Sequence, residues 1–204
     1  MFITRHNGDA IVELSKSTPF NAGLGHQEMS ASLLINPGIY RGYIFNKQTG
    51  VMTYCALDMT APGLYQTFIP ITEYGPNGTM GSWGGIYYRI NAATPFDLAA
   101  AVSALTPFGT THSALSVQDR LNLMLSSPVS LQCGESSSVL QALANAKGFP
   151  SRLVACYTNE EPNGYNDGHT CLEMKVNNKW VMFDPSLNFV WLNATTGAAL
   201  SMNE

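Results

Sequence analysis

The chain has 204 residues, enough to bury one well-formed hydrophobic core. Charged residues make up 12% of it, against a usual ~25%, and the formal net charge is -4. Because no basic stripe is present, nucleic acid and anionic membranes are excluded as expected partners. The low charge favours an extracellular, surface or virion-associated protein, with assembly into a larger complex as one expectation.

The opening residues Met1–His6 lead into polar residues instead of an apolar run of seven or more, so we expect no signal peptide. No apolar stretch has the length of a membrane span. No Cys-x-x-Cys pair indicates zinc, and we expect neither a metal nor a cofactor. The four cysteines are too scattered for a disulfide scaffold: Cys55, Cys133, Cys156 and Cys171.

The first part of the chain, residues 1–38, shows little periodicity and is predicted to be an N-terminal arm or irregular wrap. A β-rich portion follows over residues 39–94. Its β-prone runs predict four strands. These strands, with a turn at 46–50 between the first two, are residues 39–45, 51–57, 64–74 and 84–90.

A glycine-rich segment, residues 75–85, separates the last two of these strands and is too rich in glycine to be predicted as regular structure. It contains Trp83. The segment is predicted to be an ordinary connection, with a lid or substrate-contacting loop as the alternative.

Helical patterns dominate the next part of the chain. Two helices are predicted at Pro95–Leu105, with Pro95 in its first turn, and at Ser116–Ser126, with Ser116 as N-cap. A third is predicted at Cys133–Lys147, because apolar residues recur there at helical spacing and Gly148 with Pro150 ends the pattern. Cys133 therefore lies in a first helical turn, where the unpaired N–H groups and the helix dipole favour a thiolate.

Two alternating runs, His169–Val176 and Lys179–Asp184, predict strands joined by a tight turn at Asn177–Asn178. In a hairpin of this kind, His169 and Asp184 would lie opposite each other at one end of the sheet. A carboxylate in that position orients an imidazole and leaves its other nitrogen free to face a sulfur. We also predict a last strand at 186–192 and a polar tail at 193–204.

Other residues are weaker candidates for the base and for the residue that orients it. His26 and His112 precede Cys133 and lie in segments without a following residue placed to orient the ring, so we expect loop or surface histidines. Asp167 is too close in sequence to His169 to face its ring, and Asn188 would fit only with a shifted register.

Four further residues have structural interpretations. Glu135 is predicted to cap the third helix, and Arg152 to form an ion pair or a carbonyl contact. Cys156 and Cys171 lie on strands expected to be neighbours, where a symmetric loop would place them opposite each other. We expect two small buried residues there, with a disulfide as the alternative.

Four short motifs occur in a fixed order over residues 131–191. Together they resemble the pattern of the transglutaminase-like superfamily of papain-type thiol enzymes. The chain departs from that pattern at Gly134, where an aromatic residue often follows the cysteine, and it lacks an acidic cluster for calcium. The motifs are Gln132-Cys133, Gly148-Phe149-Pro150-Ser151-Arg152, Gly168-His169 and Asp184-Pro185.

The resemblance implies an α+β fold with a papain-like, transglutaminase-like core, in which the cysteine helix packs on an antiparallel sheet. That core would span residues 95–204 and form one compact domain with the β-rich portion. The catalytic residues would be Cys133, His169 and Asp184. Gln132, beside the cysteine, would line the oxyanion site or only shape the loop, and Trp83 is a second candidate for the oxyanion site.

The implied reaction is acyl transfer from an amide bond. We expect a peptidase, isopeptidase or amidase acting on a protein or peptide substrate, with cell-wall peptides among the candidates. A crosslinking transglutaminase would use the same residues with an amine as acceptor. A different class is a non-catalytic structural or virion assembly protein that keeps the fold.

Overall fold

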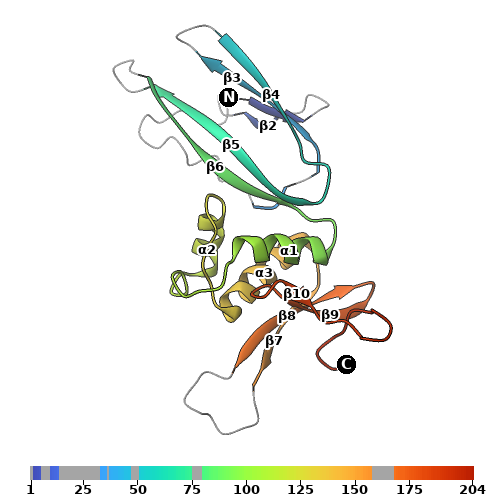
Figure 1. Ribbon diagram of the computed structural model, residues 1–204. Helices are drawn as coiled ribbons and strands as arrows, with labels where there is room; N and C mark the ends of the chain where they lie inside the picture. The colour runs from blue at the N-terminus through green and yellow to red at the C-terminus, as the bar shows by residue number, and fades with distance from the viewer. Residues whose placement is uncertain are drawn as a thin grey trace. The chain divides into compact units, whose positions relative to one another are not determined.

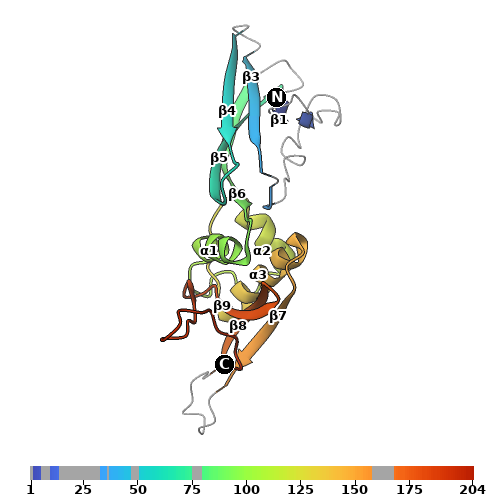
Figure 2. The ribbon, with the colours of Figure 1, turned by 90° about the vertical axis from the view of Figure 1, so that its right-hand side faces the viewer.

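The computed structural model describes residues 2–5, 10–13, 33–35, 37–46, 51–74, 80–157 and 168–204. Two compact units make up the chain, Met1–Asn91 and Ala92–Glu204, and Figures 1 and 2 show the elements of each. Within the described residues, no helix combines the length and apolarity needed to cross a membrane.

The first unit contains a four-stranded sheet with the strand order β2-β1-β3-β4. Two of its strands lie where the sequence suggested an irregular arm. They were missed because four-residue strands are too short to show alternation, and because β1 is held by pairing with the distant β3 while β2 pairs with β1. The strands are β1 (Phe2–Arg5), β2 (Ala10–Glu13), β3 (Ile39–Asn46) and β4 (Val51–Asp58).

A long antiparallel hairpin, β5 (Gly63–Tyr74) and β6 (Met80–Asn91), completes this unit. The prediction of irregular structure is wrong from Met80 onward, because β6 begins there, paired with Tyr74. Cross-strand pairing supplies the hydrogen bonds that the glycines alone did not predict. Trp83 therefore lies in a strand. The predicted connections at 47–50 and 75–79 lie outside the described residues.

In the described residues of the second unit there are three helices and a four-stranded sheet of order β10-β9-β8-β7, which confirms the α+β class. The helices are α1 (Pro95–Leu105), α2 (Val117–Met124) and α3 (Cys133–Lys147). The strands are β7 (Ser151–Cys156), β8 (His169–Val176), β9 (Lys179–Asp184) and β10 (Phe189–Val190).

Local sequence signals set the helix ends. Thr94 caps α1 in a capping box with Asp97, and the Ser116 side chain accepts from the Asp119 N–H to cap α2. Gly148, at φ +77°, ends α3 in the left-handed conformation that glycine adopts without steric cost. The predicted helices are therefore confirmed, with α2 slightly shorter than expected.

The core of the second unit forms where α3 packs against α1, α2, β7 and β8 (Figure 1). The turn between β8 and β9 is the predicted pair Asn177 and Asn178, both at positive φ, as tight hairpin turns require. Fully buried side chains fill the space between helices and sheet: Leu98, Val102, Leu105, Met124, Val139, Leu140, Leu172, Met174 and Phe183.

The segment after β9 differs from its prediction. Strand β10 spans only two residues, because the chain turns over 185–188 before it pairs with β9. The expected polar tail is docked: Leu200 accepts a hydrogen bond from the Met182 N–H at 2.9 Å, and Lys179 pairs with Glu204 at 2.9 Å. The backbone of β9 therefore organises the tail, which composition alone did not indicate.

Candidate functional site

The entry to α3 is held in place by backbone hydrogen bonds. The Leu131 N–H donates to the Pro107 carbonyl at 3.0 Å, and the Gly109 N–H donates to the Leu131 carbonyl at 2.9 Å. Two residues later, Cys133 begins the helix and is half-buried. Glu135 accepts from the Gln132 N–H at 3.0 Å, so its predicted capping role is confirmed.

The first turns of α3 are fastened to the start of β8. The buried Ser137 hydroxyl donates to the Thr170 carbonyl at 3.0 Å. Gly134 lies so close that a Cβ added there would be 3.9 Å from Thr170 Oγ1. Cys133 adjoins Gly134 and His169 adjoins Thr170, so this contact brings the cysteine and the histidine to the same end of the layer.

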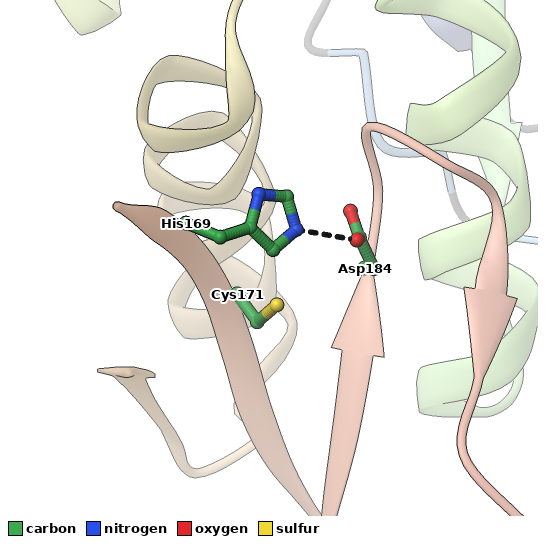
Figure 3. A group of neighbouring side chains, drawn as sticks. All are labelled: His169, Cys171 and Asp184. Carbon is green, nitrogen blue, oxygen red and sulfur yellow. Dashed lines mark hydrogen bonds and ion pairs between the residues drawn. The ribbon is translucent and has the colours of Figure 1, made fainter. Parts of the chain in front are cut away.

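His169 and Asp184 are in close side-chain contact. Nε2 of His169 lies 2.6 Å from Oδ2 of Asp184 (Figure 3). The residues are diagonal and not directly opposite: Leu172 pairs with Phe183, which puts Asp184 level with Cys171. The histidine side chain reaches across this diagonal, an ordinary distance for a long side chain on adjacent strands.

The Asp184 carboxylate is buried, with 2% of the residue exposed. Its Oδ1 accepts from the Ser186 N–H at 2.9 Å, from the Ser186 hydroxyl at 2.6 Å and from the Leu187 N–H at 3.3 Å. Its Oδ2 remains for the imidazole. Asn188, one alternative partner, is exposed in the turn before β10, and Asp167 lies outside the described residues.

The second ring nitrogen of His169, Nδ1, points away from Asp184 in Figure 3. In the described part of the chain, no hydrogen bond engages Nδ1 or joins the Cys133 sulfur to the ring. The structure thus joins His169 to Asp184 and places Cys133 nearby without bonding it. Catalytic hydrogen bonds in substrate-free enzymes are often long and tighten only when substrate binds.

The family comparison matches this region. Residues 108–185 fit the family model described as the transglutaminase-like superfamily. These residues form a transglutaminase-like domain. The resemblance inferred from the motifs is confirmed, and the match begins upstream of the first motif. No curated protein and no solved structure matches the chain at a significant level.

The superfamily is generally one of cysteine-based enzymes with a Cys-His-Asp arrangement. Cys133, His169 and Asp184 all lie within the matched residues of the transglutaminase-like domain. Their catalytic roles stay a prediction.

A second thiol, Cys171, lies in the transglutaminase-like domain beside the histidine. One ligand atom from each of His169, Cys171 and Asp184 falls within 4.8 Å of the others. Burial, followed by the charges of Asp184, Cys156 and Cys133, raises the pKa of the Cys171 thiol to about 12. Cys171 therefore stays protonated near neutral pH and is a poor nucleophile. Sequence reasoning missed this proximity, although alternation along β8 puts residues 169 and 171 on one face.

His169, Cys171 and Asp184 carry donor atoms that a metal ion can use. The carboxylate of Asp184 is already engaged, since Oδ2 faces the imidazole and Oδ1 accepts three hydrogen bonds. The Cys171 thiol, with its raised pKa, resists the deprotonation that a metal would demand. The hydrogen bonds that are present fit an oriented imidazole better than a metal centre.

The expectation that Cys156 and Cys171 face each other is wrong. Cys156 pairs with His169, and Cys171 pairs with Val154, so the two cysteines are diagonal neighbours. Both are free. Diagonal positions are about 7–8 Å apart, beyond the usual reach of a disulfide.

Four candidate residues remain, Arg152, His112, Gln132 and Trp83. Arg152 pairs with the buried Glu173 at 2.6 Å, which confirms its structural interpretation. His112 accepts from the Ser130 N–H at 3.0 Å within a loop. Gln132 is exposed at the N-cap of α3, whereas Trp83 lies in β6 of the other unit. Their oxyanion roles stay predictions.

Proposed function

We propose that the transglutaminase-like domain is a thiol enzyme that cleaves amide bonds by acyl transfer, acting as a peptidase, isopeptidase or amidase on a protein or peptide. The contact of His169 Nε2 with Asp184 Oδ2 at 2.6 Å carries this proposal. A buried carboxylate with its other oxygen fully hydrogen-bonded is well suited to orient a catalytic imidazole. The adjacent start of α3 supplies a half-buried cysteine.

In the proposed reaction, Cys133 transfers its proton to Nδ1 of His169 and its sulfur attacks the carbonyl carbon of the substrate amide. Asp184 stabilises the imidazolium that forms. The C–N bond then breaks, the Nδ1 proton passes to the departing nitrogen, and an acyl thioester remains on Cys133. Water, deprotonated by the neutral imidazole, attacks the thioester, releases a carboxylic acid and restores the thiol.

Negative charge on the carbonyl oxygen needs hydrogen-bond donors during the attack. The Gln132 N–H already donates to Glu135, so it is not a donor for the substrate. The Cys133 N–H and the Gln132 side-chain amide are the candidates that remain at this helix start. The helix dipole has its positive end there and favours the same charge.

Incubation with a mixture of peptides and a primary amine, followed by mass spectrometry, tests this function. After hydrolysis the masses of the two products add up to the substrate plus one water, whereas after transamidation they add up to the substrate plus the added amine. Activity should be lost in Cys133→Ala and kept in the control Cys156→Ala, which removes a thiol opposite His169. A wild-type chain inert toward every peptide, or an active Cys133→Ala variant, would contradict the proposal.

A further inference from the structure

The Asp184 carboxylate is held by a turn of its own chain. Ser186, two residues later, donates both its N–H and its hydroxyl to Oδ1, at 2.9 and 2.6 Å. Leu187 adds a longer bond at 3.3 Å from its N–H. Three donors on one oxygen fix the rotation of the carboxylate plane, since any turn about its bond would break several bonds together.

The orientation of the carboxylate determines which of its oxygens faces the histidine ring. With Oδ1 held by the turn, Oδ2 is directed at Nε2 of His169 at 2.6 Å. A carboxylate oxygen only accepts, so the neutral imidazole must carry its proton on Nε2, and Nδ1 becomes the unprotonated nitrogen. That nitrogen is the one that points away from Asp184 in Figure 3.

We propose that Ser186 is a positioning residue: its hydroxyl orients Asp184 so that His169 is held in the Nε2–H tautomer, with Nδ1 free to act as the base. The role of that base rests on the proposed function, but the tautomer does not. Among the described residues, the side-chain hydrogen bond of Ser186 goes to Asp184 and not to the imidazole.

Ionisable groups other than Asp184 lie on each element packed around β8. Cys171 lies on the same strand as His169, Cys156 is opposite His169 on β7, and Cys133 and Glu135 are in the first turn of α3. None of these groups donates to Asp184 Oδ1, which receives its bonds from the turn alone within the described residues. Loss of the Ser186 hydroxyl should therefore change the carboxylate without changing these neighbours.

The chain contains a matched control for this turn. In the first unit, Thr60 donates its N–H and its hydroxyl to Asp58 Oδ1 at 3.0 and 2.7 Å, with the same two-residue spacing. There the hydrogen bonds from Thr60 lower the pKa of the Asp58 carboxyl. Thr60→Ala removes an equivalent hydroxyl from a carboxylate that has no histidine partner among the described residues.

The decisive experiment is nitrogen NMR of His169 in the Cys133→Ala background, where no thiolate complicates the ring. Neutral His169 should be mainly the Nε2–H tautomer, and should become a mixture of tautomers in Ser186→Ala. Ser186→Thr, which keeps the hydroxyl, should restore the original spectrum, and Thr60→Ala should leave it unchanged. An unaltered tautomer in Ser186→Ala would overturn the proposal.

The alkylation rate of Cys133 tests whether this tautomer affects the thiol. With Cys133 present, alkylation of Cys133 at pH 6–7 should be about tenfold slower in Ser186→Ala, the size expected for losing one hydrogen bond to a charged group. A tautomer shift in a chain without amide-cleaving activity would refute the proposed function while leaving Ser186 as a positioning residue. If Ser186→Ala does not fold, Ser186→Cys, with a weak donor of similar size, gives the same NMR test.

Discussion

Ser137 donates its hydroxyl to the Thr170 carbonyl at 3.0 Å, one helical turn after Cys133 and one residue after His169. The donor is buried, since Ser137 has 0% exposure, and Thr170 is half-buried. This bond links the nucleophile's helix directly to the histidine's strand. The separation between sulfur and imidazole therefore depends on a contact that neither residue makes.

Ser137→Ala should lower the free energy of unfolding by about 1–3 kcal/mol, because the Thr170 carbonyl loses its buried donor. Cys133 alkylation should slow in the same variant, as the helix start is no longer fixed to β8. Denaturant titration and alkylation kinetics measure the two effects. Ser138→Ala is the control: that hydroxyl bonds only to Gly134 within α3. Equal stability of the two variants would contradict the linking role.

Asp184→Asn should reduce the turnover of the proposed enzyme by about 10²–10⁴-fold, because an amide that donates to Nε2 favours the wrong tautomer. The loss should fall on kcat and not on KM, since Asp184 is buried behind the ring. Steady-state kinetics on a cleaved peptide measure both constants. Asp119→Asn, in the first turn of α2, should leave both unchanged.

The three cysteines of the second unit should differ sharply in reactivity. Cys133 should be alkylated fastest at pH 6–7, whereas Cys171 should stay unmodified in the folded chain even at pH 9–10, because its pKa is raised to about 12. Mass spectrometry of peptides after timed iodoacetamide treatment measures each site. Rapid labelling of Cys171 in the folded protein would contradict the burial of this thiol.

The same thiol predicts a loss of stability in alkali. Its pKa is about 12 in the folded chain and 9.0 when unperturbed. Between these values the unfolded chain releases the proton and the folded chain keeps it, so rising pH favours unfolding. From pH 8 to pH 10.5, wild type should lose about 2 kcal/mol more unfolding free energy than Cys171→Ser, by this linkage. An equal change in unfolding free energy for the two proteins between these pH values, measured by denaturant titration, would contradict this prediction.

The ion pair of Arg152 with Glu173 joins β7 to β8, and its contribution to stability can be tested. The Arg152 guanidinium pairs with Glu173, whose side chain has 0% exposure, and lies 4.4 Å from the centre of the Trp180 ring. Arg152→Ala should cost about 2 kcal/mol, less than the ~3–5 of a fully buried pair because the arginine is half exposed. Lys179→Ala, which breaks an exposed pair with Glu204, is the control and should change little. Thermal denaturation measures both.

The local sequence pattern was sufficient to predict most helices and strands of the second unit. The ends of α3 at Cys133 and Lys147 follow from apolar periodicity and the Gly148 stop, and the bounds of β8 and β9 follow from alternation around Asn177–Asn178. The order of short motifs also predicted the transglutaminase-like match. These features depend on residues near one another in the chain, so the sequence alone determined them.

Only tertiary structure decided the rest. The diagonal register that lets His169 reach Asp184, the approach of Cys171 to both, and the docking of the tail along β9 depend on strand pairing between distant residues. Side-chain alternation indicates which face a residue occupies, but not how far one strand is offset from the next. Burial, which sets the Cys171 pKa, likewise exists only once the helices cover the sheet.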